Sequence, residues 1–158
     1  MNELFQDAIT GLISGATAAA FTALLFRSRI RQELLVEYDK ELRSSRLDAY
    51  KRLFPMFVPI ARYSREKDPT YAELKDLATK MRGWYFADGG IYLSAKSRQP
   101  YFDLKKLLDT LVSTRGAESL GDTVDPDTLN SVVESGSELR RVLADDVGAR
   151  REPLLADN

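Results

Sequence analysis

The chain has 158 residues, 23 of them basic and 24 acidic, which gives a formal net charge of -1 at pH 7. This length allows one folded domain, and the balanced charge gives no general attraction to nucleic acid. Cysteine and histidine are both absent, which excludes disulfides, thiol or imidazole catalysis and the usual transition-metal sites. The composition favours a role that is not enzymatic and that uses no metal or cofactor.

The first predicted element is a transmembrane anchor over residues 1–28. No charge occurs from Ala8 through Phe26, and this run of 19 residues is close to the ~20 that cross a bilayer core as a helix. Acidic residues precede the run, whereas Arg27, Arg29 and Arg31 follow it. Because basic flanks stay on the cytoplasmic side, we expect a single-pass protein of the plasma (inner) membrane, with its N-terminus outside and its C-terminal domain in the cytoplasm. An alanine-rich core helix of a soluble protein is the alternative interpretation.

One face of the predicted anchor carries only small side chains. Such faces let helix backbones approach closely in lipid, where packing replaces the hydrophobic effect. The sequence therefore predicts self-association of the anchor through these residues: Gly11, Ser14, Gly15, Ala18, Ala19, Thr22 and Ala23.

A stalk helix is predicted over residues 29–54, because neither glycine nor proline occurs between Phe26 and Pro55. Residues 55–158 are expected to form a cytoplasmic helical bundle that packs with the stalk. Three segments of the bundle begin with helix-capping residues, at Thr70, Ser94 and Asp125. No stretch alternates with the period of a strand. The predicted fold class is all-α: a transmembrane helix that continues into a stalk, followed by an up-down helical bundle.

The connections between these helices are also predicted. Glycines at positions 89 and 90 are expected to stop the helix that begins near Thr70, and Gly148 to end the last helix. The polar segment 114–124 is read as an exposed loop.

Several residues within this framework form a distinctive pattern. The sequence resembles an uncharacterised family of small bacterial membrane-anchored helical proteins, which have no known activity. The resemblance implies the architecture only, and it carries over no catalytic or binding residue. Its clearest part comprises Trp84, Tyr85, Phe86, Gly89, Gly90, Leu93, Ser94, Ser97 and Arg98.

The same region provides the candidate ligand site. Backbone N–H groups at the helix start, with an arginine one turn further on, could hold a phosphate or a carboxylate. The other interpretation of these residues is a helix-loop-helix corner packed by aromatic side chains, with no ligand. This second interpretation is the favoured one. The candidate residues are Trp84, Gly89, Gly90, Ser94, Ser97, Arg98 and Tyr101.

Charged residues late in the chain have two possible readings. Arg140 and Arg141 could meet phosphates or lipid head groups, but exposed helix faces often carry such charges. The pair Asp125 and Asp127 lacks the further oxygen ligands that calcium requires, so capping explains it better.

The sequence thus favours a membrane-anchored cytoplasmic helical module that acts by oligomerisation or partner binding. Its expected partners are the lipid bilayer and further copies of the chain; another protein is an additional candidate partner, and nucleic acid is not expected. Two alternatives stay open. One is a pore-forming or membrane-disrupting bacterial effector, and the other is a sensor or enzyme that binds a phosphate-containing ligand near Arg98.

Overall fold

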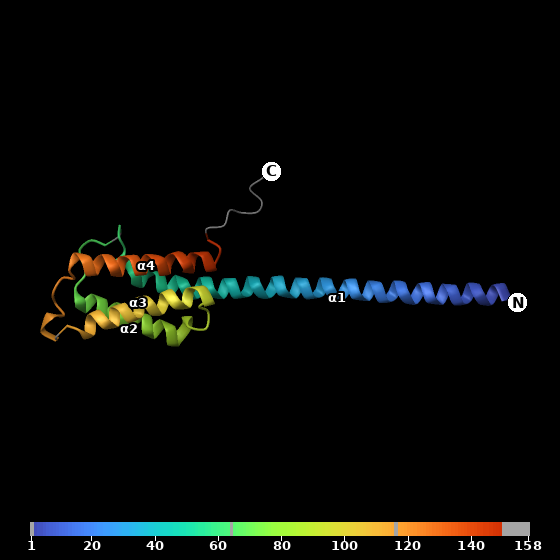
Figure 1. The fold of residues 1–158 in the computed structure, drawn as a ribbon, viewed down its shortest axis with the longest axis horizontal. Coiled ribbons are helices and arrows are strands. Elements are labelled where there is room, and N and C mark those ends of the chain that lie inside the picture. The colour runs from blue at the N-terminus through green and yellow to red at the C-terminus, as the bar shows by residue number, and fades with distance from the viewer. Residues whose placement is uncertain (1, 64, 116, 150–158) are drawn as a thin grey trace. The chain divides into compact units, whose positions relative to one another are not determined.

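The computed structural model describes residues 2–63, 65–115 and 117–149, and within them it contains four α-helices and no strand (Figure 1). The helices are α1 Asn2–Leu53, α2 Tyr71–Trp84, α3 Ala95–Ser113 and α4 Pro126–Asp146. The predicted all-helical class is confirmed. The chain divides into two compact units, Met1–Glu41 and Leu42–Asn158, so that the boundary between them falls inside α1.

The second unit is built around one hydrophobic core. Its α-helices run alternately in opposite directions, as an up-down bundle requires (Figure 1). The end of α1 contributes Ala49, Tyr50 and Leu53, all buried. The last part of the predicted stalk therefore packs with the bundle. The remaining helices contribute apolar side chains at helical spacing, chiefly Leu74, Leu77, Met81, Trp84, Tyr101, Leu104, Leu108, Leu129, Val132, Leu139 and Leu143.

All three predicted helix starts are capped. At α2 the Thr70 hydroxyl accepts from the Glu73 backbone N–H, and the Glu73 carboxylate accepts from the Thr70 backbone N–H at 2.7 Å. Ser94 caps α3 by accepting from the backbone N–H groups of residues 96 and 97. Asp125 caps α4 through Thr128, and the Tyr71 hydroxyl donates to the same carboxylate at 3.0 Å. These local signals fix where each helix begins.

The capping carboxylate of Glu73 gives a pH-dependent contribution to stability. The hydrogen bond from the Thr70 backbone, helped by nearby Lys67, lowers the Glu73 pKa. A lowered pKa in the folded state stabilises the fold above the unfolded pKa of about 4.3, and this stability is lost as the pH falls through the folded value. We expect Glu73→Ala to cost about 0.3–1 kcal/mol at pH 7 and progressively less below pH 4. Urea denaturation of both proteins at pH 7 and below pH 4 measures this loss of stability. An equal loss at the two pH values would contradict the capping role.

The connections differ from simple loops. After α1 the chain continues as the 3₁₀ helix η1 Phe54–Ile60, which contains Pro55 and Pro59. After α2 it continues as the π-helical turn η2 Tyr85–Gly89. Gly148 has a φ of 71°, which glycine adopts freely, and it lies two positions after the last residue of α4, where the helix was predicted to end.

The segment between α3 and α4 is bound to the start of α2. It includes the short 3₁₀ helix η3 Ala117–Ser119. The Tyr71 backbone N–H donates to the Asp122 carbonyl at 3.1 Å, and Val124 donates to Pro69 at 2.9 Å. Val124 is buried, so the segment predicted as an exposed loop closes one end of the core.

The predicted anchor lies where the structure traces α1 but does not describe the side chains of residues 1–25. The small-residue face from Gly11 to Ala23 is therefore outside the described side chains and stays a prediction. In the part of the chain that is described, no helix is both long enough and apolar enough to span a bilayer.

Candidate functional site

The two large aromatic residues of the candidate ligand site belong to the core. Trp84 is buried, and its indole N–H donates to the Ala49 carbonyl of α1 at 2.9 Å. The Tyr101 hydroxyl donates to the Met81 carbonyl at 2.8 Å, and burial raises its pKa. The two rings lie 5.7 Å apart between centroids. Their polar atoms are thus satisfied within the protein and tie α1, α2 and α3 together.

The two glycines allow close packing at the end of α2. A β-carbon on Gly89 would lie 2.0 Å from the Trp84 ring, and one on Gly90 would lie 2.6 Å from the Tyr85 carbonyl oxygen. Neither glycine has a positive φ. The sequence predicted that these glycines stop the helix, and the structure shows that lack of space, rather than backbone conformation, disfavours a side chain at both positions.

The two serines of the candidate site join a separate polar cluster. Ser94 Oγ donates to Asp146 Oδ1 at 2.8 Å, and Ser97 is fully buried beside it, with 3.2 Å between the hydroxyl oxygens. The Tyr50 hydroxyl lies 3.1 Å from both Asp146 Oδ2 and the Tyr92 carbonyl oxygen. This cluster connects the end of α4 to the start of α3 and to α1.

The hydrogen bonds of this cluster stabilise the fold and leave no group free for catalysis. Burial, followed by the negative charge and hydrogen bond of Asp146, raises the pKa of Tyr50 to about 12, so its hydroxyl stays protonated. Ser94 Oγ accepts hydrogen bonds from two backbone N–H groups and donates its own hydrogen bond to Asp146. These three bonds use the full hydrogen-bonding capacity of the Ser94 hydroxyl. No lone pair is left for nucleophilic attack. We therefore assign Ser94 as a cap and an interhelical connector.

Arg98 is not brought together with the other candidate residues. Its side chain is exposed and forms no hydrogen bond or ion pair with any described residue, whereas its backbone N–H donates to the Ser94 carbonyl at 3.0 Å. The favoured reading of a packed corner accounts for the aromatic residues, glycines and serines, whereas an acidic partner for Arg98 is not seen.

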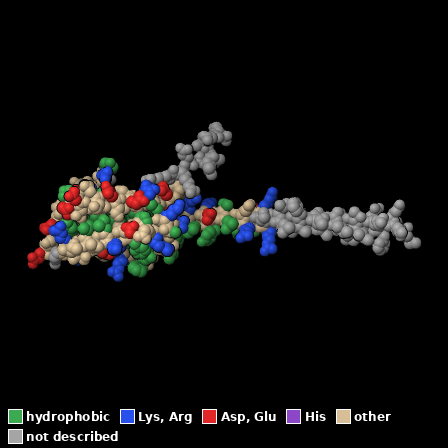
Figure 2. Space-filling model, viewed as in Figure 1, with side chains coloured by type: hydrophobic (Ala, Val, Ile, Leu, Met, Phe, Trp, Pro, Cys, Tyr) green, Lys and Arg blue, Asp and Glu red, His purple; other side chains and the backbone are tan. Residues whose placement is uncertain are grey.

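An open groove does run along the outer side of this corner. It has a volume of about 700 Å³ and includes Tyr85, Phe86 and Phe102, with charged residues at its edges. Phe86 is 77% exposed and Phe102 43% exposed. Hydrophobic side chains gather on this side of the bundle (Figure 2). Of the predicted site residues, only Tyr101 contributes to the groove.

A second cleft lies between η1 and α4, next to the contact of Ile60 with Gly136. A β-carbon on Gly136 would lie 2.6 Å from Ile60 Cδ1, so the absence of a side chain at Gly136 leaves room for the Ile60 side chain against α4. Ala61, Arg62 and Tyr63 follow η1 directly. Together with residues of α4 they line the cleft.

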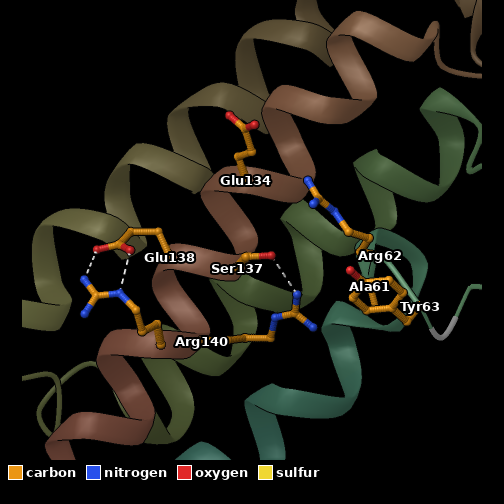
Figure 3. A pocket seen from close by; sticks show the side chains of 8 residues that line it. Ala61, Arg62, Tyr63, Glu134, Ser137, Glu138 and Arg140 are labelled. Atoms are coloured by element: carbon orange, nitrogen blue, oxygen red, sulfur yellow. Dashed lines mark hydrogen bonds and ion pairs between the residues drawn. The ribbon is translucent and has the colours of Figure 1, made fainter.

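This cleft has a volume of about 440 Å³ and is rich in arginine (Figure 3). From α4, Arg140 donates through Nε to the Gly136 carbonyl at 3.3 Å and through a terminal nitrogen to Ser137 Oγ at 3.0 Å. Figure 3 shows Arg62 pointing from the end of η1 toward the same face of α4. The two guanidinium groups flank Ser137.

The charges in this cleft are not all compensated. Arg141 is paired with Glu138 through two nitrogens, Nη2 at 2.5 Å and Nε at 2.8 Å, and it is also paired with Asp145. In contrast, neither Arg62 nor Arg140 forms an ion pair with the described residues. Burial lowers the pKa of Arg140, which marks its charge as partly desolvated.

Sequence reasoning identified Arg140 as a residue that could meet phosphates, but it did not find the cleft. Arg62 and Tyr63 lie more than seventy positions away in the chain, and the packing of η1 against α4 brings them to the same cleft. The glycine in the middle of a regular helix was the one signal available. No family model matches the sequence, and no curated protein or solved structure shows significant similarity to it.

Proposed function

We propose that this protein is a membrane-anchored helical module whose copies assemble side by side through α1. The observation that carries the proposal is an exposed row of large apolar side chains on the first unit. Phe26 is 66% exposed, Leu34 61% and Tyr38 61%, and Ile30 completes the row at intervals of four residues. In Figure 2 hydrophobic side chains lie uncovered along this stretch of the helix.

Four-residue intervals place side chains along one side of a helix. Leu35 lies next to the row and is 56% exposed. A helix that is isolated in water usually carries charges around its whole surface, whereas an apolar stripe requires a partner. The row therefore indicates a surface that is covered in the working state.

A second copy of the chain is the partner that best fits this row. If the uncharged run Ala8–Phe26 inserts in a bilayer, all copies are held in the same orientation and their rows begin at the same height. Confinement in the plane of the membrane raises their effective concentration. The small-residue face of the run permits close contact in lipid and would continue the interface into the membrane.

The arginines that follow the run fit the same arrangement. Arg27, Arg29 and Arg31 of neighbouring copies repel one another, which opposes assembly in water. Anionic lipid head groups attract such residues by about 1 kcal/mol each at the cytoplasmic surface. The membrane would thus offset the repulsion.

Membrane insertion is tested by the location of the chain and of its C-terminus. We expect a C-terminal reporter to be active only in the cytoplasm, and the chain to resist extraction by alkaline carbonate. Ala18→Arg should release the chain, because a central arginine costs about 2.5–3.5 kcal/mol and the run is only marginally hydrophobic.

Ser44→Arg provides the matched control. It adds the same charge to an exposed position of α1 outside the run, and it should leave the chain in the membrane. Recovery of the unaltered chain in the soluble fraction, or a C-terminus outside the cytoplasm, would overturn the proposed anchor.

A further inference from the structure

We propose that the cleft between η1 and α4 binds a phosphate monoester group, held by the guanidinium groups of Arg62 and Arg140. This site is separate from the assembly surface on α1. The same ligand chemistry occurs in soluble metabolites and in the head group of phosphatidic acid.

The first argument is the state of Arg140. Its guanidinium is partly withdrawn from water and is oriented by two neutral acceptors, the Gly136 carbonyl and the Ser137 hydroxyl. Neutral acceptors leave the charge uncompensated, and a partly desolvated charge without a counter-ion is costly. The remaining N–H groups of Arg140 are available to an anion in the cleft.

The second argument is the arrangement of a second arginine across the same cleft. Arg62 is exposed, and its side chain points toward α4 (Figure 3). Arg141, although it lines the cleft, is already neutralised by Glu138. Two uncompensated guanidinium groups on opposite walls match a doubly charged anion with several acceptor oxygens.

The acidic side chain on the wall refines the choice of ligand. Glu134 lies on α4 in this cleft and has no basic partner among the described residues. It repels a simple anion but can accept a hydrogen bond from a hydroxyl group. A phosphate monoester with a neighbouring hydroxyl, such as glycerol 3-phosphate, therefore gains a contact that phosphatidic acid cannot make, because the glycerol hydroxyls of phosphatidic acid are esterified.

The proposal is tested by calorimetric titration of the full chain in a neutral detergent. The probes are inorganic phosphate, glycerol 3-phosphate and short-chain phosphatidic acid, with short-chain phosphatidylcholine as the uncharged comparison. We expect saturable binding of at least one monoester and none of phosphatidylcholine. Binding of glycerol 3-phosphate alone indicates a soluble ligand, whereas tighter binding of phosphatidic acid indicates a lipid head group.

Three arginine variants assign the binding to the cleft. Arg140→Gln and Arg62→Gln should each weaken binding by about tenfold or more, because each removes a charge-assisted contact. Arg98→Gln is the matched control, since that arginine is exposed and lies outside the cleft. It should bind like the unaltered chain.

Arg62 is exposed, so its variant should stay folded even if Arg140→Gln is destabilised; circular dichroism verifies both. Absence of binding to every monoester would overturn the proposal. So would binding that Arg98→Gln abolishes and the two cleft variants preserve.

Discussion

Replacing Gly89 with alanine should lower the free energy of unfolding by about 3 kcal/mol or more, as expected for overpacking in a rigid core. The added β-carbon would lie 2.0 Å from Cζ2 and 2.1 Å from Cε2 of Trp84. The indole has little freedom to move, because it is buried and donates to Ala49. The ring also contacts Tyr50 and Tyr101 at centroid distances of 6.5 and 5.7 Å.

Gly83→Ala is the control for this prediction. Gly83 is exposed in α2, and no atom lies within 4 Å of the position that its β-carbon would take. Alanine has the higher helix propensity, so this variant should be more stable by about 0.5–1 kcal/mol. Urea denaturation followed by the fluorescence of the single tryptophan measures both variants. Equal effects of the two substitutions would show that Trp84 can move aside.

The starts of the helices could be predicted because their signals are local. Thr70 and Glu73 are three residues apart, and Ser94 and Asp125 bind backbone groups within their own first turns. Such short-range hydrogen bonds form with little loss of chain entropy and do not depend on the rest of the fold. The apolar stripes of the bundle helices were equally clear in the sequence.

Other features could not be predicted because they join distant parts of the chain. The contact of Ser94 with Asp146 spans 52 positions, and the binding of residues 120–124 to the start of α2 spans about fifty. Nothing in the local sequence distinguishes an N-cap serine that also connects two helices from one that does not. For the same reason, Trp84 could be read as a ligand-binding residue although it is part of the core.

The structure distinguishes the two arginines considered as anion ligands by the surroundings of their side chains, which the sequence does not give. Arg98 follows a helix start, a position that favours anions, yet its side chain lies in open solvent. Arg140 has no such sequence signal, but it is partly buried and has no acidic partner among the described residues, so that its charge is uncompensated there. Desolvation makes the interaction with an anion stronger, because the surrounding water screens it less. The environment of the arginine therefore decides between them.

The orientation of paired copies has a large and specific expected effect on cross-linking. The chain has no cysteine, so an introduced one is the only thiol that can react. In a parallel pair each member of the exposed row meets its own counterpart. We expect Ile30→Cys to give mainly disulfide-linked dimers in isolated membranes with an added oxidant. Gln32→Cys, on the opposite side of the helix, should give few.

The charge pattern of the helix would favour the opposite orientation if the copies were free in water. An antiparallel pair centred on Leu34 places Arg31 opposite Glu37 and Arg29 opposite Asp39. Each such exposed pair contributes only about 0–1 kcal/mol. Copies anchored in one membrane cannot adopt this arrangement, because both helices must leave the bilayer in the same direction.

A mixture of Ile30→Cys and Tyr38→Cys chains separates the two orientations. An antiparallel pair brings position 30 of one copy next to position 38 of the other, so dimers would form mainly between the two variants. A parallel pair gives mainly dimers within each variant, since these positions lie about 12 Å apart along a helix. Preference for the mixed dimer would therefore exclude assembly of copies that share one membrane, and with it the proposed role of the anchor.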